Sequence, residues 1–173
     1  EPEAFNEITA KINRNINDKD KEITDFIAPI DVALKAAGFK YEIKKRVKTP
    51  YSIWNKMNNK GIPFDQIYDL YAVRIIFDPD KDSKETERDQ CYHVFSIITG
   101  LYRYKADRVR DWVNYPKNNG YEALHCTLMS NAGFWIEVQI RSTRMNEIAE
   151  KGIAAHWAYK KNGFAEENES EMD

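Results

Sequence analysis

The chain has 173 residues, which is enough for one domain with a hydrophobic core. Its composition is that of a soluble globular protein, with 42% hydrophobic and 31% charged residues. The formal net charge of -2 argues against a protein that binds nucleic acid over its whole surface. We therefore expect no direct DNA binding, and we expect any basic site to be local.

Cysteine usage and the absence of targeting patterns predict a cytoplasmic protein. Cys91 and Cys126 lack metal-type spacing and favour a reducing compartment. No apolar run is long enough to span a membrane, and the acidic, polar N-terminus does not resemble a signal peptide. We expect no membrane partner. Because the sequence does not begin with Met, we also expect it to be a piece of a longer chain.

The first third of the chain predicts helix followed by strand. Apolar residues recur every three or four positions over 3–37, which is typical of helical structure. Pro29 is expected to divide this stretch or to begin a second helix, and Gly38 to end it. Residues 39–47 alternate between apolar and charged side chains, which predicts a basic strand.

The later elements alternate between helices and strands. They are predicted, in chain order, as a helix from Pro50 to near Gly61, a connector at 62–68, a strand at 70–77, a charged loop at 78–89, a helix at 90–102, a short strand at 109–113, a turn-rich loop at 114–120, a hairpin of strands 124–129 and 134–140, and a helix at 142–159.

This order predicts one α/β (α+β) domain with a mixed β-sheet flanked by helices. We expect residues 1–38 to form an N-terminal helical segment that packs on the domain. Residues 39–161 should form the domain itself, and 162–173 a disordered acidic tail.

A basic stretch follows the first predicted strand. Arg46 and Lys48 share one face of the strand end, and Ser52 and Lys56 share one face of the next helix. The first turn of that helix offers free backbone N–H groups, so strand, turn and helix together suit phosphate binding. A solvated basic surface is the alternative reading.

Two carboxylates sit beside apolar strands. Asp69 precedes one strand, and Glu137 shares a face of another with Gln139 and Arg141. Mg²⁺ prefers one or two carboxylates together with phosphate oxygens, so the pair suits a magnesium–nucleotide site. Ion pairs of Asp69 with Arg74 and of Glu137 with Arg141 explain the pattern equally well.

The loop before residue 121 combines several groups that can bind a nucleotide. It offers the cation of Lys117, the amide of Asn119 and the ring of Tyr121, and an aromatic ring can stack on a base. The alternative is a Gly-containing turn whose Tyr121 packs on the sheet. His125 can either move a proton or serve as a satisfied core histidine.

In their joint order, these motifs resemble the synthetase domain of the RelA/SpoT family of guanosine penta- and tetraphosphate synthetases. The resemblance covers about 39–161 and includes an ending typical of long, ribosome-associated members. The motifs are Arg46-x-Lys48-x-x-x-Ser52-Ile53-x-x-Lys56-Met57, Tyr68-Asp69-Leu70-x-Ala72-x-Arg74, Pro116-Lys117-x-Asn119-Gly120-Tyr121-x-x-Leu124-His125, Glu137-x-Gln139-Ile140-Arg141 and Ala149-Glu150-x-Gly152-x-Ala154-Ala155-His156-Trp157-x-Tyr159-Lys160.

The resemblance implies a nucleotidyltransferase-like fold and a GTP pyrophosphokinase activity. Such an enzyme transfers the pyrophosphate of ATP to the 3′-hydroxyl of GDP or GTP, giving AMP and ppGpp or pppGpp. For the donor ATP, Arg46 matches the position that contacts the adenine. Lys48, Ser52 and Lys56 match phosphate-binding positions, and Lys56 is also expected to assist catalysis.

For the metal and the acceptor, the resemblance implies further roles. Asp69 and Glu137 match the carboxylates that bind Mg²⁺, with Mn²⁺ as an alternative metal, and both are expected to be catalytic. Glu137 is also the expected base for the 3′-hydroxyl. Tyr121 matches the residue that stacks on guanine. The remaining expected acceptor contacts are Lys117, Asn119, His125 and Gln139.

Other features bear on regulation and on competing functions. The segment Arg108-Val109-Arg110-Asp111 is basic, as in bifunctional members, although Arg110 stands where Lys is usual. The three histidines form no His-Asp metal-hydrolase motif, so this piece should not degrade the alarmone. A polymerase would show two carboxylates spaced by one residue after a Gly-Ser turn, and none is present.

One alternative of the same fold stays open, a catalytically weak or inactive nucleotide-binding regulator. The expected partners are ATP and GDP or GTP, and a longer parent chain can add contacts with the ribosome or with regulatory domains.

Overall fold

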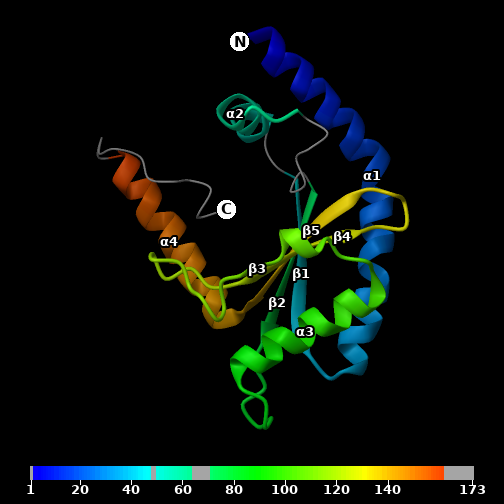
Figure 1. Ribbon diagram of the computed structural model, residues 1–173, viewed down its shortest axis with the longest axis vertical. Coiled ribbons are helices and arrows are strands. Elements are labelled where there is room, and N and C mark those ends of the chain that lie inside the picture. Colours follow the sequence, from blue (N-terminus) through cyan, green and yellow to red (C-terminus); the bar gives the residue numbers. More distant parts are fainter. Residues whose placement is uncertain (1, 48–49, 64–70, 162–173) are drawn as a thin grey trace.

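A computed structural model of the chain describes residues 2–47, 50–63 and 71–161 (Figure 1). The elements follow the predicted order. They are α1 (Pro2–Ala36), β1 (Lys40–Val47), α2 (Pro50–Lys60), β2 (Tyr71–Asp78), α3 (Glu87–Leu101), a 3₁₀ turn (Ala106–Arg108), β3 (Arg110–Asp111), β4 (Leu124–Met129), β5 (Trp135–Ser142) and α4 (Thr143–Lys161). The predicted tail at 162–173 and most of the connector before β2 lie outside the described residues. None of the described helices is both long and apolar enough to cross a membrane.

The strands form one five-stranded sheet in the order β1-β2-β5-β4-β3. The central pair, β2 and β5, is parallel, and the other neighbours are antiparallel. The mixed sheet expected from the sequence is therefore confirmed. The predicted hairpin of β4 and β5 is also confirmed, and it closes through Ser130 N–H to the Phe134 carbonyl at 3.0 Å.

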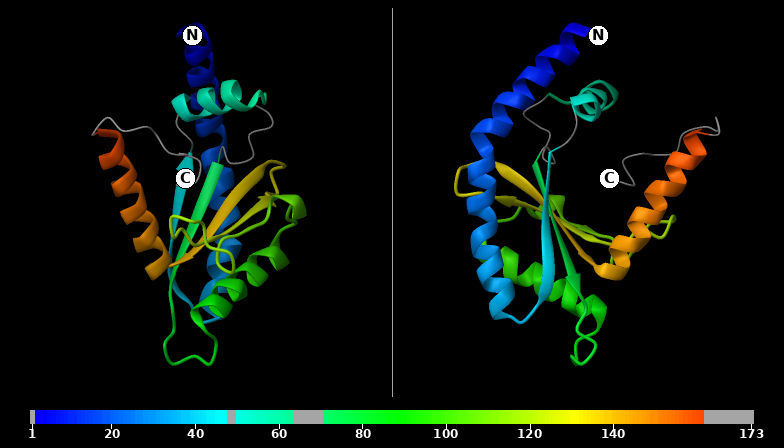
Figure 2. Two further views of the ribbon diagram at one scale, coloured as in Figure 1. Left: turned by 60° about the vertical axis from the view of Figure 1, so that its left-hand side comes forward. Right: turned by 180° about the vertical axis from the view of Figure 1, so that it is seen from behind.

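One face of the sheet is apolar and forms the core. Helices α1 and α3 cover this face, whereas α4 projects on the other side (Figure 2). Because successive strand residues point to opposite faces, the apolar residues come from alternate positions. The central strands contribute Val73, Ile75 and Phe77 from β2, Ile136, Val138 and Ile140 from β5, and Leu124, Cys126 and Leu128 from β4.

Helix α1 joins this core through side chains spaced about one turn apart. Phe26, Ile30 and Leu34 are buried in the same cluster as the strand residues. Tyr102, after α3, stacks on Phe26 with ring centroids 4.5 Å apart, and its hydroxyl donates to the Phe26 carbonyl at 2.9 Å. The division of the chain at residue 38 stays a prediction.

The expectation that Pro29 would break the helix is wrong, because α1 continues through it. Pro29 lies on the exposed face, where water can bind the carbonyl that its missing N–H leaves free. The predicted end at Gly38 is confirmed. Gly38 has φ +84, its N–H donates to the Lys35 carbonyl, and Phe39 N–H donates to the Leu34 carbonyl.

Several element boundaries differ from the predictions by one to three residues, and two of these differences have a local cause. Helix α3 begins at Glu87, three residues early, because Thr86 caps it by accepting a 3.1 Å hydrogen bond from Asp89 N–H. Strand β3 is only two residues long. It ends early because the Asp111 carboxylate accepts hydrogen bonds from the N–H groups of Val113 and Asn114 and turns the chain.

The packing of α1 predicts a contrast between two positions on the same helix. Leu34 is fully buried and Val32 is 71% exposed. Leu34→Ala should lower the free energy of unfolding by about 2–5 kcal/mol, because it leaves a cavity in the core. Val32→Ala should change it by less than about 0.5 kcal/mol. Urea denaturation measures both, and equal small effects would mean that α1 does not unfold together with the sheet.

Candidate active site

The second face of the sheet carries polar side chains in rows that cross the strands. Residues opposite one another in neighbouring strands point to the same face, so the register defines these rows. The first row is Arg46, Ala72, Glu137 and Thr127. The second row is Lys44, Arg74, Gln139, His125 and Arg110. Since α1 and α3 pack on the opposite face, this polar face is the candidate active site.

Gln139 links the carboxylate at the centre of this face to two arginines. Its Nε2 donates to Glu137 Oε1 at 2.8 Å. Its Oε1 accepts from Arg74 Nε at 3.2 Å and from Arg141 at 3.4 Å. Glu137 is 9% exposed and Gln139 is 1% exposed, so this network holds the carboxylate in a fixed position near the surface.

The arginines form a positive cluster, and the side chains that accept hydrogen bonds from Arg74 and Arg141 are neutral. Burial, followed by the charges of Arg141 and Arg46, lowers the pKa of Arg74 to about 10. Arg141 is fully buried and donates to Tyr121, Gln139 and Asn146, none of which is a carboxylate. A bound polyanion would relieve the repulsion between these guanidinium groups.

Tyr121 and His125 lie beside this cluster. The Tyr121 hydroxyl accepts a 2.6 Å hydrogen bond from Arg141 and lies 2.8 Å from His125 Nε2. Burial, followed by the charges of Arg141 and Lys117, lowers the pKa of His125 to about 3. His125 is therefore neutral near pH 7, and its Nε2 can accept a hydrogen bond from the Tyr121 hydroxyl.

The Tyr121 ring is packed in the structure described here. It is 1% exposed, and Arg141 Cζ lies 5.0 Å from its centroid. Burial raises the pKa of Tyr121, although Arg141 acts in the opposite direction. The ring thus adopts the packed position that the sequence offered as the alternative to base stacking. A ring in this position can stack on a base only after it moves out.

The acceptor candidates Lys117 and Asn119 lie in a tight loop that leads into Tyr121. Gly120 N–H donates to the Lys117 carbonyl at 2.8 Å, and Asn119 Oδ1 accepts from Tyr121 N–H at 3.0 Å. Gly120 has φ +88, a conformation that favours glycine. Lys117 Nζ lies 4.7 Å from the centroid of Trp112, which is a cation–π contact.

Three of the four residues expected to bind the donor ATP, Arg46, Ser52 and Lys56, lie within the described residues. Arg46 is half-buried near the end of β1, in the same row as Glu137. Ser52 and Lys56 are half-buried on α2, the element that follows β1 in the chain (Figure 1). Lys48 and Asp69 lie outside the described residues, so their predicted roles stay predictions.

Of the two carboxylates expected to bind magnesium, Glu137 lies within the described residues. Within residues 2–47, 50–63 and 71–161 there is no group of three or more His, Cys, Asp or Glu residues that could hold a metal. Mg²⁺ in nucleotide sites needs only one or two carboxylates, because phosphates and water supply the other oxygens. The position of Glu137 among cations that attract phosphate fits such a site.

Arg74 and Arg141 are functional candidates that sequence reasoning missed. It treated each only as an ion-pair partner of a nearby carboxylate. A usable signal was present for Arg74, because it interrupts an otherwise apolar run in β2. A charge at such a position is retained only when polar groups or a ligand compensate for it. Arg141 gave no such signal, because β5 also contains Glu137 and Gln139.

Comparisons with known proteins agree on one family. The region found in RelA/SpoT proteins matches residues 45–164. The chain is 35% identical to the GTP pyrophosphokinase of Escherichia coli over 164 residues, 95% of this chain and 21% of that protein. It is also 35% identical over 160 residues to guanosine-3′,5′-bis(diphosphate) 3′-pyrophosphohydrolase of Aquifex aeolicus, 92% of this chain and 22% of that protein. The chain thus spans about a fifth of the length of these relatives.

The fold has a similar solved structure. The small alarmone synthetase 2 from Bacillus subtilis superposes with a TM-score of 0.61 at 24% identity, over 96% of this chain and 85% of that one. At this identity, the likeness supports the fold alone.

The burial of His125 predicts a pH dependence of stability. The pKa of His125 falls from 6.5 to about 3 on folding, so between these values the unfolded chain binds more protons than the folded one. Stability should therefore fall as the pH falls through this window, by at most about 1.4 kcal/mol per pH unit from this residue. His125→Gln should flatten the dependence. Urea unfolding of both proteins at several pH values measures it, and parallel curves would contradict the assignment.

Proposed function

Because the chain belongs to the RelA/SpoT family, we propose that it is a GTP pyrophosphokinase domain. It transfers the pyrophosphate of ATP to the 3′-hydroxyl of GDP or GTP, which gives AMP and ppGpp or pppGpp. The observation that carries this proposal is the position of Glu137, a fixed carboxylate on the polar face beside the arginine cluster. A transfer of this kind needs one group that accepts a proton and several that neutralise phosphate charge.

Glu137 acts as the base for the acceptor. The 3′-oxygen attacks the β-phosphorus of ATP, and its proton moves to the Glu137 carboxylate as the new P–O bond forms. The bond between the β-phosphorus and the oxygen shared with the α-phosphate breaks, and AMP leaves with that oxygen. The hydrogen bond from Gln139 keeps the Glu137 carboxylate oriented while the proton is transferred.

The cations bind and neutralise the transferred group. Arg46, Arg74 and Arg141 are held close enough to influence one another, so they form a prearranged positive surface. We propose that Lys48, Ser52 and Lys56 complete the donor site, with Arg46 toward the adenine. Lys56 should act most strongly on the charge that develops on the phosphates during transfer.

The proposed metal is Mg²⁺, with Glu137 and Asp69 as its protein ligands. When bound, it supplies positive charge that polarises the phosphoryl oxygens and lowers the barrier to attack. Mn²⁺ has similar ligand preferences and is the alternative.

The acceptor site consists of the tight loop and the adjoining end of the polar face. We propose that Lys117, Asn119, His125 and Gln139 contact the acceptor nucleotide. Tyr121 stacks on guanine after its ring leaves the packed position, which breaks the contacts of its hydroxyl with Arg141 and His125.

A weak or inactive regulatory domain of the same fold is the second candidate, because the relatives are about five times longer than this chain. The A. aeolicus relative carries the name of a hydrolase. The hydrolase motif was not found in this sequence, so we assign that activity to other parts of such proteins. A cytoplasmic location and contacts with a ribosome stay predictions from the sequence.

A carboxylate-to-amide change tests the proposed function. Glu137→Gln keeps the size of the side chain but removes the proton acceptor, so it should lower kcat by about 10²–10⁴-fold. Formation of AMP and ppGpp from ATP, GDP and Mg²⁺ is measured by chromatography. Asp25→Asn, on the exposed side of α1, is the matched control and should leave the rate unchanged. Normal turnover by Glu137→Gln would exclude Glu137 as the base.

A pair of substitutions tests the role of Tyr121. Stacking on a base contributes roughly 1–3 kcal/mol, so Tyr121→Ala should raise the KM for GDP about tenfold or more. Tyr121→Phe keeps the ring and loses only the hydroxyl, so it should retain most of the affinity for GDP. The KM for ATP should stay nearly constant in both variants. If Tyr121 serves only for packing, Tyr121→Ala lowers stability and affects both substrates alike.

A further inference from the structure

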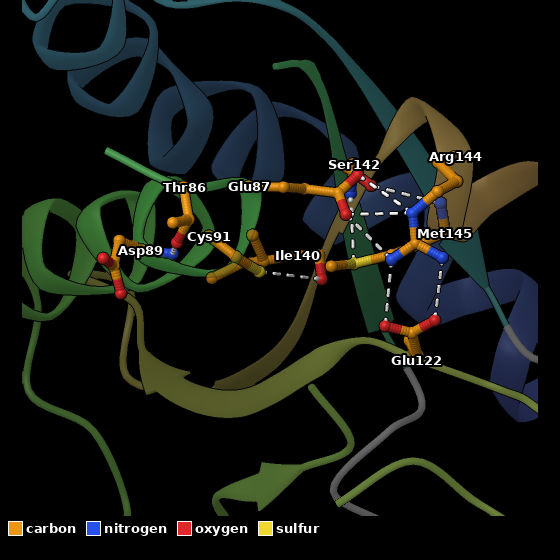
Figure 3. Close-up of polar contacts among 9 residues, drawn as sticks. All are labelled: Thr86, Glu87, Asp89, Cys91, Glu122, Ile140, Ser142, Arg144 and Met145. Carbon is orange, nitrogen blue, oxygen red and sulfur yellow. Dashed lines mark hydrogen bonds and ion pairs between the residues drawn. The ribbon is translucent and has the colours of Figure 1, made fainter. Parts of the chain in front are cut away.

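The guanidinium of Arg144 binds two carboxylates from separate parts of the chain (Figure 3). Its Nε donates to Glu87 Oε1 at 2.9 Å, and its terminal nitrogens donate to Glu122 Oε2 and Oε1 at 2.9 and 3.0 Å. Arg144 lies in the first turn of α4, Glu87 in the first turn of α3, and Glu122 just before β4. One side chain thus connects three segments.

The location of Arg144 is unfavourable for its own helix. The N-terminal turn of a helix favours negative charge, and the first turn of α4 contains no acidic residue. Hydrogen bonds from Arg144 and Ser142 lower the pKa of Glu87, although burial acts to raise it. The helix alone does not explain a cation at this point, whereas the two carboxylates do.

Glu122 lies directly after the proposed acceptor loop, where the chain returns to the sheet. Tyr121 precedes it, and Ala123 follows it with a carbonyl that accepts a 2.9 Å hydrogen bond from Trp112 N–H. The loop that carries Lys117 and Asn119 therefore returns to the sheet at Glu122. Holding Glu122 fixes the end of this loop.

Two arginines at the junction of β5 and α4 bind two consecutive residues, Tyr121 and Glu122. Arg141 donates to the Tyr121 hydroxyl on the inside of the molecule. Arg144, three residues later, binds the Glu122 carboxylate at the surface, where Arg144 is 48% exposed and Glu122 is 18% exposed. The inner contact is made to the Tyr121 hydroxyl, and the outer contact is made to the side-chain carboxylate of the next residue.

We propose that Arg144 is a positioning residue for the acceptor nucleotide. This proposal rests on the proposed function. By holding Glu122 between α4 and α3, it keeps the backbone of the loop at 117–121 in the conformation that receives GDP or GTP. Loss of this contact lets the loop move, so that ordering it costs free energy each time the acceptor binds. The contact leaves the donor site and the proton transfer at Glu137 unaffected.

Kinetic variants test this role. Arg144→Ala and Glu122→Gln should each raise the KM for GDP by roughly tenfold, less than the hundredfold that misplacing a reacting group can cost. The KM for ATP and kcat should stay within about twofold of wild type. In Arg144→Lys, the single ammonium group cannot bind both carboxylates with paired hydrogen bonds, so the KM for GDP should rise by an intermediate amount. Glu87→Gln should give a smaller increase than Glu122→Gln.

Two controls separate positioning from general stability. Lys21→Ala breaks an exposed ion pair with Asp25 on α1 and should change neither KM. The double variant Arg144→Ala/Glu122→Gln should resemble Arg144→Ala, because both substitutions remove the same contact.

Hydrogen exchange gives a readout that does not depend on activity. The amides of Lys117, Gly120 and Tyr121 are bonded within the loop. They should exchange faster in Arg144→Ala and Glu122→Gln than in wild type, while the amides of α1 stay unchanged.

The outcomes distinguish the two proposals. If Arg144→Ala lowers only the unfolding midpoint, and both the KM for GDP and the loop exchange match wild type, Arg144 is a structural ion pair and the inference is wrong. If the wild-type chain forms neither AMP nor ppGpp, the proposed function fails instead. Faster loop exchange in the variants would then still support Arg144 as the residue that holds the loop.

Discussion

The buried charge of Arg141 is the constraint on which the polar face depends. A guanidinium without solvent exposure is costly unless its donors find acceptors. The two terminal nitrogens of Arg141 find acceptors in the Tyr121 phenol, the Gln139 amide of its own strand and Asn146 of α4, whereas its Nε has no hydrogen-bond partner among the described residues. Each partner comes from a different segment, so burying this one charge orients Tyr121, Gln139 and the start of α4 together.

The same charge determines the electrostatic character of the site. The hydrogen-bond partners of Arg141 are neutral, and its charge acts on the neighbouring groups. It contributes to the lowered pKa values of Arg74 and His125. The protein thus holds its cations in place before any phosphate arrives. Such prearrangement is effective in catalysis because no reorganisation is needed when charge develops.

Much of the fold could be predicted from the sequence, because periodicity reports directly on which side chains are buried. The alternation in residues 134–140 predicted that Glu137, Gln139 and Arg141 share a face, and the register confirms it. Periodicity does not say what covers a face. The packed ring of Tyr121 and the complete burial of Arg141 depend on α4 and on the loop before β4, which come from other parts of the chain. Likewise, Pro29 failed as a helix breaker because tertiary packing outweighs local propensity.

The parallel pairing of β2 with β5 has a consequence for how the chain folds. The β4–β5 hairpin and the β1–β2 pair each join nearby segments, but Arg74 and Gln139 meet across 65 residues. Closing so long a loop is slow, and contacts of this kind form late in folding. Glu137 and Arg46 share a row only after this step. During synthesis, the sheet therefore cannot be completed until β5 has emerged, and the candidate active site forms late in folding.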